Sequence, residues 1–140
     1  MTTTFVLESH LRARGLWNPD GVHRAARARY CKKCGAVVLV GLDDDTSAFT
    51  AIADPFPLDG PGELTALLTG RTTYRLRWAG GRYELDARDQ FHIAGSPPGA
   101  LDVTGRLVEV LAAHACGQVL STAALADPRP AYVRHQEPPY

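Results

Sequence analysis

The sequence predicts a mainly β domain of the α+β class, built from antiparallel hairpins with one short helix. Two observations lead to this prediction. Apolar and charged residues alternate over 72–78 and again over 82–88, and Gly80-Gly81 separates the two runs. A Gly-Gly pair supplies the positive φ values that a tight hairpin turn requires. A third run, Gly35–Leu42, is apolar and rich in β-branched residues, which is typical of a buried strand.

The start of the chain is expected to be a flexible arm over residues 1–22. Gly15, Asn18-Pro19 and Asp20-Gly21 interrupt any helix that residues 5–14 could begin. Residues 23–29 then form either one helical turn or an extended segment that leads into Tyr30. The folded domain is expected to span 23–125, and residues 126–140, with four prolines, are expected to form an extended tail.

The middle of the chain supplies the remaining elements. Residues 48–53 read as the hairpin partner of the first apolar strand, with a turn at Asp43–Thr46, and Asp54-Pro55 ends that partner strand. Leu64, Leu67 and Leu68 are spaced as one face of a short helix over 63–69. Residues 91–94 are a short apolar piece. Residues 102–116 fit either a helix or a strand.

Composition places the chain among ordinary globular proteins. Its 140 residues are 45% hydrophobic and 21% charged, which is enough for one domain with a modest core. No run approaches the roughly 18 apolar residues of a membrane span, and the first residues lack the order of a signal peptide. We therefore expect a cytoplasmic protein that has no membrane partner.

The net charge is zero, but the charge is unevenly distributed. Between His10 and Gly35 there are seven basic residues and one acid. This segment is either a solvated surface or a phosphate-binding patch. The residues that would contact nucleic acid are Arg24, Arg27, Arg29, Lys32 and Lys33.

Two short motifs, Cys31-Lys-Lys-Cys34-Gly and His114-Ala-Cys116-Gly, supply four potential metal ligands. Three thiols and one imidazole are the ligand types of a closed, tetrahedral structural zinc site, and this set uses every cysteine of the chain. An odd number of cysteines also rules out a complete set of intramolecular disulfides. The sequence therefore predicts a structural Zn²⁺ held by Cys31, Cys34, His114 and Cys116, with His92 as a reserve ligand.

The spacing of the second pair tests the ambiguous segment. Residues two apart on a helix point about 200° away from each other, whereas on a strand they share a face. A shared metal therefore requires an extended conformation at His114. Two alternatives remain: ordinary, partly buried cysteines, or a redox pair activated by the neighbouring lysines. The strand expected after Gly35 disfavours a redox motif, which is followed by a helix.

These motifs resemble those of the zinc-ribbon class. The matching parts are the knuckle at Cys31–Gly35, the strand that follows it, and a distant second knuckle at His114–Gly117. Here the second pair is H-x-C, and a long insert containing the 72–88 hairpin separates the knuckles, so the chain looks like an elaborated member. The resemblance implies a structural metal and a role in binding nucleic acid or protein, with no catalytic residues.

The motifs of zinc enzymes are missing from the sequence. A zinc deaminase requires H-x-E and P-C-x-x-C, and neither occurs. A zinc hydrolase requires an open coordination position and a nearby base, yet the acid nearest to the second pair is Glu109. We therefore expect no enzyme, but a small zinc-binding protein-interaction or assembly module. The alternative is a nucleic-acid-binding accessory or regulatory protein that uses the segment around Arg24–Lys33.

Overall fold

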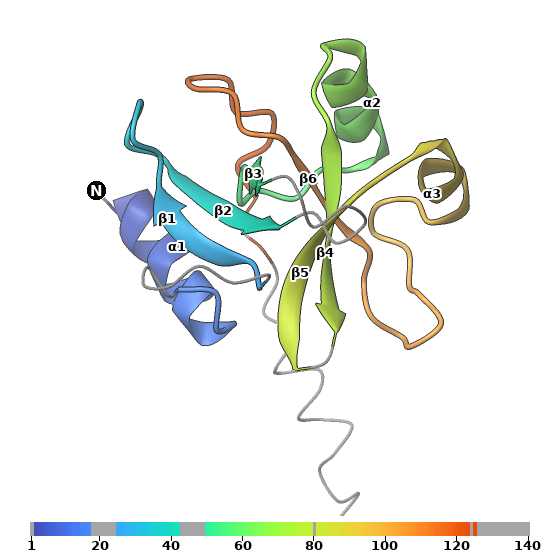
Figure 1. Ribbon diagram of the computed structural model, residues 1–140, viewed down its shortest axis with the longest axis horizontal. Coiled ribbons are helices and arrows are strands. Elements are labelled where there is room, and N and C mark those ends of the chain that lie inside the picture. The colour runs from blue at the N-terminus through green and yellow to red at the C-terminus, as the bar shows by residue number, and fades with distance from the viewer. Residues whose placement is uncertain (1, 18–24, 43–49, 80, 124, 126–140) are drawn as a thin grey trace, which may run out of the picture.

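The computed structural model describes residues 2–17, 25–42, 50–79, 81–123 and 125. Over these residues the chain is mainly β with short helices, as predicted (Figure 1). The elements in chain order are α1 (Thr2–Ala13), β1 (Arg27–Tyr30), β2 (Val37–Leu42), β3 (Thr50–Ala53), α2 (Gly60–Leu68), β4 (Thr73–Ala79), β5 (Arg82–Ala87), α3 (Gln90–Gly95) and β6 (Glu109–Ala112).

The strands form two antiparallel three-stranded sheets, in the orders β1-β2-β3 and β5-β4-β6. The predicted hairpin is β4–β5, in register from Tyr74↔Ala87 to Ala79↔Arg82. Backbone hydrogen bonds also join the two sheets at both sides. On one side the His114 amide donates to the Ile52 carbonyl at 2.8 Å, and on the other the Ala26 amide donates to the Tyr83 carbonyl at 2.8 Å.

Both sheets contribute to one main core. Leu39 of β2, Leu85 of β5 and Leu111 of β6 are fully buried in the same cluster. A smaller cluster lies beside α2 and contains Leu58, Ala66, Val108, Val110 and Ala112. Because the sheets are joined at both sides and share a core, the side chains on either sheet are held in place by both sheets.

The N-terminal residues differ from the expected arm. Residues 2–13 form α1, and Leu7, Leu11 and Leu16 are buried in the main core. Gly15 has φ 78°, and the Leu16 amide donates to the Leu11 carbonyl at 2.8 Å, which is the Schellman arrangement that ends a helix. Gly15 is therefore a helix cap and not a break in an arm. Residues 18–24, 43–49 and 126–140, which include Arg24, the Asp43–Asp45 turn and the tail, lie outside the described residues.

The helix α2 starts earlier than predicted and turns a different face inward. Asp59 caps it by accepting from the Gly62 amide at 2.7 Å. The expected face is wrong: Leu64 and Leu68 are exposed, while Glu63 and Ala66 are buried. The carboxylate of Glu63 can be buried because it forms an ion pair with Arg88.

The ambiguous segment contains a strand and not a helix. β6 pairs with β4, with Thr73↔Ala112 and Leu76↔Glu109 as the ends of the register. The short apolar piece at 91–94 is instead part of helix α3, which Asp89 caps. None of the helices in the described part of the chain is long and apolar enough to cross a membrane.

Candidate metal centre

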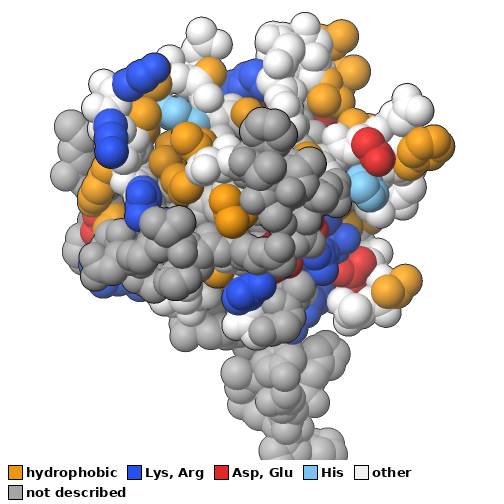
Figure 2. Space-filling view, in the orientation of Figure 1, with side chains coloured by type: hydrophobic (Ala, Val, Ile, Leu, Met, Phe, Trp, Pro, Cys, Tyr) orange, Lys and Arg blue, Asp and Glu red, His pale blue; other side chains and the backbone are white. Residues whose placement is uncertain are grey.

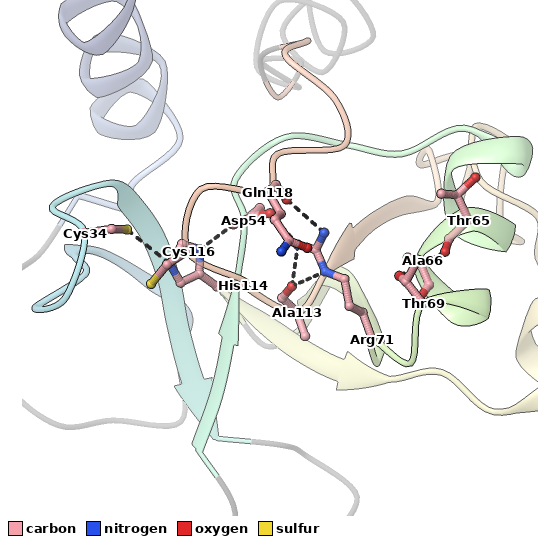
Figure 3. A network of polar contacts seen from close by, with 10 residues as sticks. All are labelled: Cys34, Asp54, Thr65, Ala66, Thr69, Arg71, Ala113, His114, Cys116 and Gln118. Atoms are coloured by element: carbon pink, nitrogen blue, oxygen red, sulfur yellow. Dashed lines mark hydrogen bonds and ion pairs between the residues drawn. The ribbon is translucent and has the colours of Figure 1, made fainter.

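The structure brings together the four side chains that the motifs predict. Cys31 and Cys34 lie at the turn between β1 and β2, and His114 and Cys116 follow β6. Their four potential ligand atoms, three Sγ atoms and one imidazole nitrogen, all lie within 4.8 Å of one another. Figure 3 shows Cys34, His114 and Cys116 converging from the two segments. The cluster therefore joins the β1–β2 turn to the segment after the last strand.

Three of the distances between these atoms fit a tetrahedral ion. Metal–sulfur bonds of about 2.3 Å and metal–nitrogen bonds of about 2.05 Å, at tetrahedral angles, place two sulfurs about 3.8 Å apart and a sulfur and a nitrogen about 3.6 Å apart. The Sγ atoms of Cys31 and Cys116 are 3.8 Å apart. The Nε2 atom of His114 lies 3.4 Å from the Sγ atom of Cys34 and 3.5 Å from that of Cys116. The cluster is thus compatible with one metal ion.

The backbone explains why each pair can point inward. Gly35 and Gly117 both have φ 77°, a conformation that favours glycine, so both knuckles turn sharply after their second ligand. The Gly35 amide donates to the Cys31 carbonyl at 2.8 Å, which closes the first knuckle. The His114 amide is bonded to β3, which fixes the start of the second knuckle.

Two residues that the sequence analysis missed orient the imidazole. His114 Nδ1 lies 2.7 Å from Asp54 Oδ1, and Asp54 Oδ2 lies 2.8 Å from Arg71 Nη2. Arg71 also donates to the carbonyls of Ala113 and Gln118 (Figure 3). A proton on Nδ1 that is donated to Asp54 leaves the lone pair of Nε2 directed at the sulfurs. Such carboxylate–histidine pairs are the usual support of a metal-bound histidine.

Electrostatics at the cluster favour a cation. The backbone amides of Cys34 and Lys33 lower the pKa of Cys31 to about 6. Hydrogen bonds with the thiols of Cys34 and Cys31 raise the pKa of Cys116 to about 11. Burial lowers the pKa of His114, but the hydrogen bond with Asp54 raises it, and the net shift is upward. Without a metal the thiols therefore resist ionising together, whereas a bound dication would stabilise all of them as thiolates.

The predicted phosphate-binding residues are only partly available. Arg27 is buried and therefore offers little surface for a phosphate contact. Arg29 is half-buried, and Lys32 and Lys33 are exposed on the turn between the first two cysteines. Arg24 lies outside the described residues. The reserve ligand His92 is not in the cluster, because it lies on α3 and caps that helix with Asp89.

Comparisons with known proteins assign no family. No protein-family model, no curated protein and no solved structure among those searched matches the chain. The zinc-ribbon resemblance therefore stays a prediction from the two motifs. What the chain does has to be argued from its own cluster and surface.

Proposed function

We propose that this protein is a small zinc-binding module that works by binding other molecules and not by catalysis. The observation that supports it is the match between the spacing of the cluster atoms and a tetrahedral Cys₃His shell. Tetrahedral sites of sulfur and nitrogen ligands favour zinc over the hard cations, which prefer oxygen. Zn²⁺ held by Cys31, Cys34, His114 and Cys116 would tie the β1–β2 turn to the end of β6.

A structural role follows from the number of ligands. A catalytic zinc keeps one position for water or substrate and is held by three protein ligands, whereas a structural zinc has four. Here four side chains are available, and the acid that contacts the cluster, Asp54, is engaged by His114 and Arg71. Neither an open position nor a free general base is supplied by these residues.

Metal analysis tests the zinc assignment directly. The purified protein should contain one zinc per chain, and a chelator should lower the melting temperature. His114→Ala should abolish stoichiometric binding, while the matched variant His92→Ala, which changes an exposed histidine on α3, should retain it. A metal-free protein whose melting temperature is unaffected by chelator would refute the proposal.

The first candidate for the binding role is protein interaction or self-assembly. Large apolar side chains are exposed on α2 and α3, with Leu68 at 78% and Phe91 at 76% of full exposure. Figure 2 shows hydrophobic side chains on the side of the molecule that carries these two helices. Exposed apolar surface of this kind favours contact with another protein chain. Sedimentation over a range of concentrations tests self-assembly, which Leu68→Ser with Phe91→Ser should weaken; a strict monomer would remove self-assembly from the proposal.

The second candidate is nucleic-acid binding, and one surface specifically favours it. Lys32 and Lys33 project from the knuckle, and two aromatic rings lie at the adjacent end of β1. A basic, aromatic surface suits single-stranded nucleic acid. Binding that weakens with salt would support this candidate, and failure to bind at low salt would refute it.

A further inference from the structure

A small recess with an aromatic wall lies beside β1. It has a volume of about 350 Å³, and its lining includes Trp17, Ala28, Arg29 and Tyr30. This volume is near the lower end of the range for small-ligand sites, about 300 to 1,000 Å³. The lining therefore brings two aromatic rings to one place.

The two rings are held in a fixed arrangement. Trp17 and Tyr30 meet edge to face, with centroids 5.6 Å apart and an interplanar angle of 84°. The guanidinium carbon of Arg12 lies 5.3 Å from the centroid of the Trp17 ring. The Tyr30 hydroxyl donates to the Glu8 carboxylate of α1, which further restrains its ring. Tyr30 is nevertheless 53% exposed, so part of its ring remains open to a ligand.

The charges around the recess are mostly positive. Arg12 from α1 is exposed, Arg29 is half-buried, and Lys32 and Lys33 are exposed two and three residues beyond Tyr30. The nearby Glu8 is acidic, and its carboxylate accepts a hydrogen bond from the Tyr30 hydroxyl. Figure 2 shows Lys and Arg side chains beside hydrophobic ones at the β1–β2 turn. Exposed cationic residues beside two aromatic rings complement a ligand that has both a flat ring and phosphates.

We propose that this recess binds one base of a single-stranded nucleic acid against Tyr30 and Trp17, while Lys32 and Lys33 contact the neighbouring phosphates. Stacking on an aromatic ring accepts any base, so the site selects strands whose bases are unpaired. A duplex keeps its bases stacked on one another and offers only phosphates. This proposal deepens the second candidate function, on which it rests.

Fluorescence anisotropy with a labelled oligothymidylate tests the proposal on the zinc-loaded full chain. If Lys32 and Lys33 each neutralise one phosphate, the slope of log K against log salt is about −1.4, which is a loss of about sevenfold between 50 and 200 mM salt. Lys32→Ala with Lys33→Ala should remove this loss. The control Arg82→Ala, which changes an arginine at the start of β5, should leave the salt dependence unchanged.

Variants of Tyr30 separate stacking from charge. Tyr30→Leu retains apolar bulk without the ring and should weaken binding by roughly 5- to 140-fold, the loss of one stacked base. Tyr30→Phe retains the ring and should bind as the native chain does, as should the matched control Phe91→Ala on α3. Zinc content and circular dichroism establish that each variant is folded.

Each other outcome refutes a distinct part of the proposal. Salt-dependent binding that Tyr30→Leu leaves unchanged would refute the aromatic recess while preserving nucleic-acid binding. A duplex of the same length that binds as tightly as the single strand would also refute it, and so would a mononucleotide that competes as well as the strand. Failure to bind the oligothymidylate at 50 mM salt would refute both the recess and the second candidate function, leaving the zinc assignment untouched.

Discussion

Replacing Asp54 by asparagine should weaken metal binding although Asp54 is not a ligand. The buried carboxylate accepts from His114 Nδ1 through one oxygen and pairs with Arg71 through the other. Asparagine has one acceptor oxygen and one NH₂ group, so either His114 or Arg71 must face a donor. If the amide donates to Nδ1, the imidazole proton moves to Nε2, the nitrogen that lies among the sulfurs.

The loss expected for a missing histidine support is about 10- to 100-fold in metal affinity, or about 1.4 to 2.8 kcal/mol. Competition for zinc between the protein and a chromophoric chelator near neutral pH measures it. Asp59→Asn is the matched control, because Asp59 caps α2 and asparagine caps helices equally well. An Asp54→Asn affinity within twofold of the native value would show that Asp54 does not set the tautomer of His114.

Three further predictions test the pH dependence and the packing of the domain. Metal affinity should fall at least about tenfold for each pH unit below 8, because the proton of Cys116 must leave before the metal binds, and more steeply below pH 6, where Cys31 also gains a proton. Zinc competition across pH 5 to 8 measures this slope, and a flat profile would contradict it. Leu11→Ala should lower the free energy of unfolding by about 2–5 kcal/mol, because loss of its fully buried side chain leaves a cavity. The control Leu68→Ala, at an exposed position, should change the free energy of unfolding by less than about 0.5 kcal/mol. Urea melts measure both values, and an equally small effect of Leu11→Ala would mean that α1 does not stabilise the domain. Glu63→Ala should cost about 3–5 kcal/mol in the same melts, because it leaves Arg88 buried without its carboxylate, and a neutral result would contradict a buried pair.

The ligand cluster could be predicted from the sequence because its chemistry is local. Each of the two ligand pairs has a short spacing and is followed by a glycine, and the four residues together include every cysteine of the chain. The one-residue spacing of His114 and Cys116 also required an extended backbone, and the chain after β6 is not helical. The β4–β5 hairpin was predictable for the same reason, since its alternation and its glycines are adjacent in sequence.

Features that depend on distant partners were not predictable. Asp54 looked like the end of a strand, and its role requires His114, 60 residues away. The inward face of α2 was misassigned because Glu63 is stabilised inside by Arg88, 25 residues away, which allows the helix to expose its leucines. Gly15 looked like a break, although the same residue type caps a helix when leucines before and after it reach a core. In each case the local sequence pattern is compatible with two structures, and contacts with residues distant in sequence determine which one forms.

The position of the cluster indicates what a metal would contribute. Structural zinc binds zinc-finger peptides with about 10–16 kcal/mol, which is comparable to the whole net stability of a small domain, about 5–15 kcal/mol. The cluster joins segments 80 residues apart in sequence, yet β3 already meets the residue after β6 through the Ala53–Ala113 bridge. Strand pairing therefore already accounts for part of the entropic cost of bringing the two knuckles together. Loss of the metal should first release the two knuckles, where both segments leave the sheets, while the core between Leu85 and Leu111 retains its own contacts.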